Sequence, residues 1–131
     1  MELKLVLCHE NYWEFVRECR THPNNQEGFF TQANITPEQQ KQFMIHNWSK
    51  YKICLVDNEP AGYVGLLHGH EITYCVHPDF HGKGVGTFMI ETYSKSFSTV
   101  DAFVKLDNIA SQKVFEKLGF EKQIYYKWQK K

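Results

Sequence analysis

The sequence predicts a single α/β domain in which about four helices flank a central twisted sheet, mixed but mostly antiparallel. Three observations support this fold class. Short apolar segments separated by turn residues fill much of the first half of the chain, as in a strand meander. After residue 76 the pattern changes to strand–helix alternation. The length of 131 residues is enough for one hydrophobic core and leaves no room for a second domain.

Four apolar segments of the first half have the length of strands and are bounded by polar residues. These segments are residues 3–7, 52–56, 62–67 and 72–76. Asp57-Asn58-Glu59-Pro60 has the composition of a turn, so the second and third segments are predicted to form a hairpin. Between the first and second strands, Tyr12 to Cys19 repeats apolar residues at helical spacing. The polar stretch from residue 21 to 33 is predicted to be a loop.

The next helix has a clear start signal. Thr36 stands at the cap, Pro37 at the first helical position and Gln39 three residues after the threonine, which is the pattern of a capping box. We expect this helix to run to about Asn47, with Phe43, Met44 and Trp48 turned inward.

The second half of the chain alternates between strands and helices. A loop with three glycines leads into a helix whose apolar residues recur at helical spacing from Val85 onward. A further helix is predicted from the cap Asn108 to Leu118-Gly119, where glycine ends it. The remaining predicted strands are residues 100–106 and 120–128.

Composition limits the partners and the location. Lys plus Arg and Asp plus Glu both number 15, and this neutral balance argues against general binding to nucleic acid or to an anionic membrane. The amino terminus has no basic region followed by an apolar core, so no secretion signal is expected. The cysteines are predicted to be reduced core thiols of a cytoplasmic protein, and they are Cys8, Cys19, Cys54 and Cys75.

The glycine loop, His81-Gly82-Lys83-Gly84-Val85-Gly86, lies between a predicted strand and a predicted helix. Glycines allow positive φ and a close approach of the backbone to a ligand, and a helix start presents free amides to an anion. The loop is therefore a candidate phosphate site, while a simple flexible turn is the alternative. Its spacing matches neither the P-loop nor the dinucleotide fingerprint.

Two motifs resemble a known family. Val76-His77-Pro78-Asp79-Phe80 with the glycine loop resembles the acetyl-coenzyme A loop of the Gcn5-related N-acetyltransferases, the GNAT family. Asn108-Ile109-Ala110-Ser111 with Phe115-Glu116-Lys117-Leu118-Gly119-Phe120 resembles that family's later helix. The resemblance implies that residues 1–131 form one N-acetyltransferase domain. It implies transfer of an acetyl group from acetyl-coenzyme A to a primary amine.

The resemblance also assigns residues to acetyl-coenzyme A. These are Cys75 and Val76 on the strand, His81, Gly82, Lys83, Gly84, Val85, Gly86 and Thr87 in the loop, and Asn108 and Ser111 on the later helix. Two positions depart from the family pattern. His81 stands where glutamine or arginine is usual, and Phe115 stands where many members carry a tyrosine that protonates the departing thiolate. The group that protonates the thiolate here is therefore left open.

A base must take a proton from the amine, and histidine suits this task near neutral pH. The family's usual base position, about eleven residues before the loop, falls on His70, with Glu71 beside it and His68 two residues earlier. On a strand His68 and His70 would share one face and Glu71 would take the other. His70 and then Glu71 are the candidate catalytic residues. A solvated turn and a metal site are the alternatives for the histidine pair.

The sequence says less about the amine that accepts the acetyl group than about the acetyl donor. Arg20 to Asn24 and Ile35 to Gln40 resemble the branch that acetylates amino sugars on nucleotides or the amino termini of ribosomal proteins. The predicted acceptor is a small-molecule amine or a nucleotide-linked amino sugar. The alternatives are a protein or peptide amine and a non-catalytic acetyl-coenzyme A sensor, which Phe115 would favour. The aromatic final strand would suit a homodimer.

Overall fold

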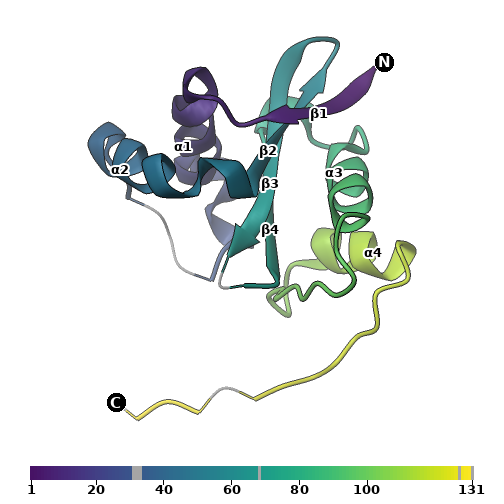
Figure 1. Cartoon of the computed structure of the whole chain (residues 1–131). Helices are drawn as coiled ribbons and strands as arrows, with labels where there is room; N and C mark the ends of the chain where they lie inside the picture. Colours follow the sequence, from purple (N-terminus) through teal and green to yellow (C-terminus); the bar gives the residue numbers. More distant parts are fainter. Residues whose placement is uncertain (31–33, 68, 127, 131) are drawn as a thin grey trace.

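A four-stranded antiparallel sheet lies between two pairs of helices in the computed structural model, which describes residues 1–30, 34–67, 69–126 and 128–130 (Figure 1). The strands, in spatial order, are β1 (Leu3–Leu7), β2 (Tyr51–Val56), β3 (Glu59–Leu67) and β4 (Glu71–Val76). One face carries α1 (Trp13–Thr21) and α2 (Pro37–Asn47), and the other carries α3 (Val85–Ser94) and α4 (Ile109–Lys117). The predicted fold class is confirmed.

Alternation along the strands divides the core between the two faces of the sheet. On the α3 side the buried cluster contains Val64 and Ile72 from the strands, together with Met89 from α3. On the α1 side the buried cluster contains Tyr63 and Cys75. The chain therefore has two apolar layers with the sheet between them, and β4 contributes to both.

Local signals in the sequence fix several boundaries. The β2–β3 hairpin turns through Asp57 and Asn58, both with positive φ, 48° and 69°, as a tight two-residue turn needs. At the start of α2 the Thr36 hydroxyl accepts from the Gln39 N–H at 3.2 Å. The Gln39 side chain accepts from the Thr36 N–H at 2.9 Å. The capping box and the helix from residue 37 to 47 are confirmed.

One expectation for α2 is wrong. Met44 is fully buried and Trp48 is partly buried, but Phe43 keeps 42% of its surface exposed. The Phe43 ring lies at the margin of the α1-side cluster, edge-on to Tyr51 with the ring centroids 6.1 Å apart. The helix therefore places this ring at the edge of the core.

Two predicted strands are also wrong. In residues 100–106 only Asp101 pairs, through a single parallel bridge to Glu71. The described residues from 120 onward contain no strand, and this part of the chain runs away from the body of the domain (Figure 1). Both segments have the composition of strands, but a strand also needs a partner edge. The described sheet is consequently antiparallel, with that bridge as its one parallel pairing among the described residues.

All four cysteines are free and buried. Across the described ranges, no helix combines the length and the apolar character that a membrane span requires.

Candidate active site

On its outer side, β4 pairs with the rest of the described chain at one point only. The Ile72 N–H donates to the Asp101 carbonyl at 2.7 Å, and the Asp101 N–H donates to the His70 carbonyl at 2.8 Å. Beyond this bridge the ladder does not continue within the described residues, so the outer edge of β4 is left without a strand partner from Thr73 onward. A cleft of about 700 Å³ lies along this edge.

The glycine loop closes one end of the cleft. Gly82 and Gly84 have positive φ, 76° and 78°, and Gly84 is the N-cap of α3. The first helical hydrogen bond runs from the Phe88 N–H to the Gly84 carbonyl at 3.1 Å. The amides of the first turn therefore have no acceptor within the helix. No heavy atom lies within 4 Å of where a Cβ would stand on Gly82 or Gly84, so an anion has room to approach these amides.

The structure brings most of the predicted cofactor residues to one place. Those lining the cleft are Cys75, Val76, His81, Gly82, Gly84, Val85, Gly86, Thr87, Asn108 and Ser111. Lys83 is different, because it is exposed, its ammonium lies 5.5 Å from the centroid of the Phe80 ring, and it does not line the cleft. The Val85 side chain belongs to the α3-side core, so this residue offers only its backbone to a ligand.

Several of these side chains are engaged within the protein. The His81 ring donates to the Val76 carbonyl at 3.0 Å, which ties the loop to the end of β4. The Asn108 carboxamide oxygen accepts from the Ser111 N–H at 3.2 Å and caps α4. The Ser111 hydroxyl lies 2.5 Å from the hydroxyl of Tyr74.

Tyr74 is a cleft residue that the sequence analysis missed. The available signal was one phenol inside a strand segment, residues 72–76, whose other residues are apolar apart from Thr73. Its bond to Ser111, 37 positions away, depends on the tertiary structure.

The two candidate bases occupy different environments. His70 lies in the turn between β3 and β4, not on a strand as expected, and it is exposed and absent from the cleft lining. Glu71 is the first residue of β4, is partly buried and lines the cleft. Alternation places Glu71 on the same face as Cys75, toward α1. His68 lies outside the described residues, among which no group of three or more His, Cys, Asp or Glu side chains is placed to hold a metal ion.

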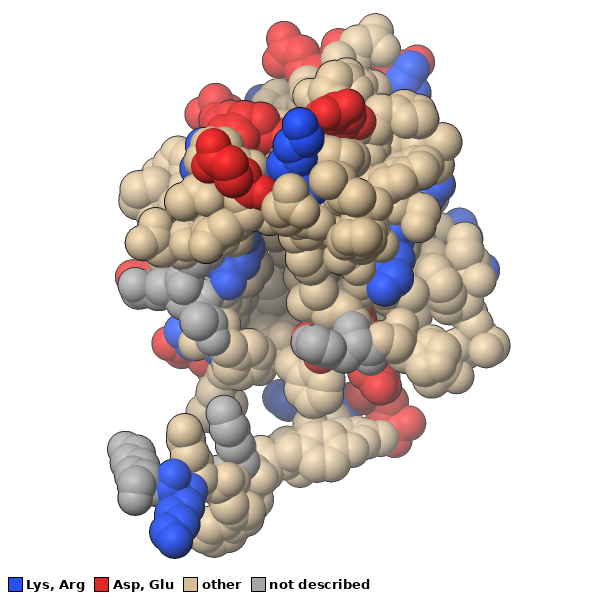
Figure 2. Space-filling view, turned by 60° about the vertical axis from the view of Figure 1, so that its left-hand side comes forward, with Lys and Arg blue, Asp and Glu red and all other residues tan. Residues whose placement is uncertain are grey.

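The α1 side of the cleft is formed by α1 and the short helix η2 (Pro23–Gly28). The Arg20 guanidinium stacks 3.6 Å from the centroid of the Phe29 ring, and both residues line the cleft. The Lys105 ammonium donates to the Glu27 carbonyl at 3.0 Å, which links η2 to the chain beyond the bridge. The face in Figure 2 is hollowed in its middle, with acidic side chains gathered above the hollow and separate basic side chains beside it.

Comparison with known proteins identifies the family. The sequence profile of the acetyltransferase (GNAT) family matches residues 9–120. The chain belongs to the GNAT acetyltransferase family. As a GNAT acetyltransferase it is an enzyme that uses acetyl-coenzyme A as its acetyl donor and an amine as the acceptor.

Solved structures agree with this fold. The GNAT-family acetyltransferase from Bacillus anthracis superimposes with a TM-score of 0.76 at 19% identity, covering 96% of this chain and 84% of that one. Spermidine N-acetyltransferase from Vibrio cholerae gives 0.75 at 16% identity, covering 92% and 82%. A ribosomal-protein alanine N-acetyltransferase from Escherichia coli gives 0.68 at 15% identity, covering 94% and 80%. At these identities the likeness establishes the fold and leaves the acceptor open.

The loop geometry generates a prediction for this GNAT acetyltransferase. Replacing Gly84 with valine is expected to weaken acetyl-coenzyme A binding at least tenfold, about 1.4 kcal/mol. The side chain would fill the open space above the amides and would strain a backbone with φ 78°. Isothermal titration calorimetry with acetyl-coenzyme A measures the change.

Gly69→Val is the matched control. Gly69 has φ 82° and equally open surroundings, but it lies in the β3–β4 turn outside the cleft lining. This variant should bind acetyl-coenzyme A like the wild type. Equal losses in both variants would trace the effect to backbone strain, and unchanged affinity in Gly84→Val would exclude the loop as the phosphate site.

Proposed function

We propose that the protein transfers the acetyl group of acetyl-coenzyme A to the primary amine of a small molecule in the cleft between β4 and α4. The open outer edge of β4, beside the free amides of α3, is the observation that carries this proposal. The four free thiols fit a cytoplasmic location for the reaction.

The backbone of the protein offers acetyl-coenzyme A two binding surfaces in this cleft. The amides from Gly82 to Thr87 suit the pyrophosphate, because several donors and the positive end of the α3 dipole converge there. The unpaired edge of β4, ending at Cys75 and Val76, suits the amides of the pantetheine arm, which would pair with it as an added strand does. Asn108 and Ser111 add polar groups at the start of α4, across the cleft from that edge.

Glu71 is the base that the geometry favours. An alkyl amine is largely protonated at neutral pH and must lose a proton before it attacks the thioester. A carboxylate that lines the cleft lies on the route of the acceptor, and Glu71 meets this condition while His70 lies outside the lining. His70 remains the second candidate, as a relay between Glu71 and solvent.

The size and walls of the cleft favour a small acceptor. A volume of about 700 Å³ lies within the range of small-molecule sites. The link from Lys105 to Glu27 joins the two walls of the cleft, which leaves less room for a folded protein chain. Phe30 is 67% exposed beside this link and offers a ring on which a sugar or base could stack, as a nucleotide-linked amino sugar requires.

Two other functions have specific support. A ribosomal-protein alanine is the acceptor named for the Escherichia coli relative, which supports a protein or peptide amine as the acceptor. An acetyl-coenzyme A sensor without turnover would agree with Phe115, which lacks the hydroxyl of the usual tyrosine.

The proposed function predicts that the protein turns over acetyl-coenzyme A in the presence of a suitable amine. With acetyl-coenzyme A present, at least one class of small amine should raise thiol release above the rate of hydrolysis in a chromogenic thiol assay. The panel holds amino sugars, nucleotide-linked amino sugars, polyamines, amino acids and peptides with free amino termini. Release with peptides alone would favour the protein acceptor, and tight binding without release by any amine would favour the sensor.

A further prediction distinguishes between the two candidate bases, Glu71 and His70. Glu71→Gln keeps the shape of the side chain but cannot take a proton, so kcat with the best amine should fall about 10²- to 10⁴-fold. Affinity for acetyl-coenzyme A should stay near that of the wild type. His70→Ala is the matched control and should lower kcat only slightly. A normal rate in Glu71→Gln with a large loss in His70→Ala would reverse this assignment.

We propose that the carboxyl-terminal segment from residue 124 onward forms a homodimer interface. Its exposed apolar side chains are Ile124, Tyr125, Tyr126 and Trp128, with 78%, 74%, 84% and 91% of their surfaces accessible. Such a patch is typical of an interaction surface. Sedimentation velocity should show a dimer for the wild type and a monomer for Ile124→Asp/Tyr126→Asp. Ile45→Asp, which changes an exposed residue of α2, should remain dimeric, and a monomeric wild type would exclude the interface.

A further inference from the structure

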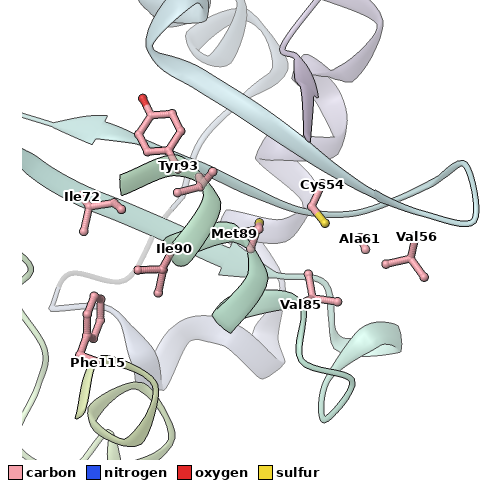
Figure 3. Close-up of a cluster of buried hydrophobic side chains, with 10 residues drawn as sticks. Cys54, Val56, Ala61, Ile72, Val85, Met89, Ile90, Tyr93 and Phe115 are labelled. Atoms are coloured by element: carbon pink, nitrogen blue, oxygen red, sulfur yellow. The ribbon is translucent and has the colours of Figure 1, made fainter. Parts of the chain in front are cut away.

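The departing sulfur needs a proton, and the residue at position 115 cannot supply one. When the amine attacks the thioester, the C–N bond forms, the C–S bond breaks, and the electron pair of that bond goes to sulfur. Phe115 carries no O–H group, and this residue is only 8% exposed, in the α3-side core near Ile90 (Figure 3). The face of α4 that meets the cleft therefore has no phenol of its own at this position.

A phenol reaches the same face of α4 from the sheet. Tyr74 lines the cleft from β4, and its hydroxyl lies 2.5 Å from the Ser111 hydroxyl. Ser111 and Phe115 are four residues apart on α4, so they lie one above the other on one side of the helix. The Tyr74 ring meets Phe115 edge-on, with the ring centroids 6.2 Å apart.

The packing around Tyr74 fixes the position of its ring. A Cβ on Gly86 would lie 3.1 Å from Cε2 of Tyr74, so glycine in the first turn of α3 lets the ring lie close to that helix. The phenol is thus held between the start of α3 and the start of α4. It has one defined hydrogen-bond partner and a position beside the cleft.

Tyr74 and Glu71 flank the open edge of β4 from opposite sides. They are three residues apart on a strand, so their side chains point to opposite faces of the sheet. A thioester lying along this edge would have the carboxylate toward its acceptor side and the phenol toward its α4 side.

We propose that Tyr74 is the proton donor to the sulfur of coenzyme A and that Ser111 is the positioning residue for its hydroxyl. This inference rests on the proposed function. As the C–S bond breaks, the Tyr74 O–H transfers its proton to sulfur, and the product is the neutral thiol. The ammonium first gives one proton to the Glu71 carboxylate, which passes it to solvent. The second proton, lost from nitrogen as the C–N bond forms, then goes to the same carboxylate. Exchange with solvent then returns Tyr74 to the phenol and Glu71 to the carboxylate, so the enzyme ends unchanged.

The protonation state of Tyr74 agrees with this role. Burial raises the pKa of the Tyr74 phenol, the bond to Ser111 lowers it and the neighbouring Cys75 raises it, with a net shift upward. The group is therefore the protonated phenol at neutral pH, the form that a proton donor needs.

The test starts with Tyr74→Phe, which removes one oxygen and keeps the ring. With the best amine, kcat should fall about 10²-fold, the lower end of the range for lost general acid–base catalysis. The KM for acetyl-coenzyme A should stay within about twofold of the wild-type value, because uniform binding is not lost. Tyr93→Phe is the matched control, since it removes another phenol, one that is buried in the α3-side core, donates to the Lys50 carbonyl and lies outside the cleft lining.

A second readout does not depend on turnover. The thiol of bound coenzyme A is titrated by the ultraviolet absorbance of its thiolate. A phenol that donates to the thiolate stabilises the charged form, so the thiol pKa should be higher in Tyr74→Phe than in the wild type or in Tyr93→Phe. Ser111→Ala should raise this pKa by a smaller amount, because the phenol remains but is less well oriented.

Rescue distinguishes a chemical role from a structural one. In the Tyr74→Phe background, Phe115→Tyr returns a phenol to the same region from α4 and should restore part of the lost kcat. Wild-type kcat and an unshifted thiol pKa in Tyr74→Phe would overturn the proposal. If no amine supports turnover in the wild type, the proposed function fails, and the thiol titration still decides whether Tyr74 acts on the sulfur.

Discussion

The arrangement of this protein depends on one parallel bridge between Glu71 and Asp101. Two backbone hydrogen bonds hold the chain that follows α3 against β4 at this point, and the ladder then stops within the described residues. A continued ladder would have consumed the outer amides and carbonyls of β4. Because it stops, those groups face a cleft whose far end meets the free amides of α3. The interrupted ladder thus leaves a continuous line of free backbone groups, which runs along the outer edge of β4 to the first amides of α3.

In the proposed binding mode, this line would let a chain with equal numbers of acidic and basic residues bind a highly anionic donor. The one lysine of the glycine loop is exposed beside Phe80 and lines no part of the cleft. In the proposed binding mode, backbone dipoles whose positions the fold fixes therefore hold the phosphates of the donor. Gly82 and Gly84 keep the surface above these amides open, while His81 ties the loop to the Val76 carbonyl.

The sequence predicts the structure correctly where interactions between residues that are close along the chain determine it. The capping box at Thr36, the turn at Asp57-Asn58 and the glycine loop were all predicted from local patterns. The segments 100–106 and 120–128 were not, because strand-like composition does not reveal whether a partner edge exists. His70 was expected on a strand, but the β3–β4 turn includes it. Tyr74 was missed because its environment comes from α3 and α4, which are distant in sequence.

The alternation of β4 also bears on how the proposed acid and base work together. A carboxylate and a phenol on the same face, within hydrogen-bonding distance, would share a proton and each would lose part of its reactivity. Here the backbone of β4 separates Glu71 from Tyr74, so each group meets the reaction from its own side. In the proposed mechanism the amine approaches from the α1 side, where the carboxylate lies, and the sulfur departs toward α4, where the phenol lies. A single strand can in this way support opposite proton transfers at its two faces, with its open edge holding the thioester between them.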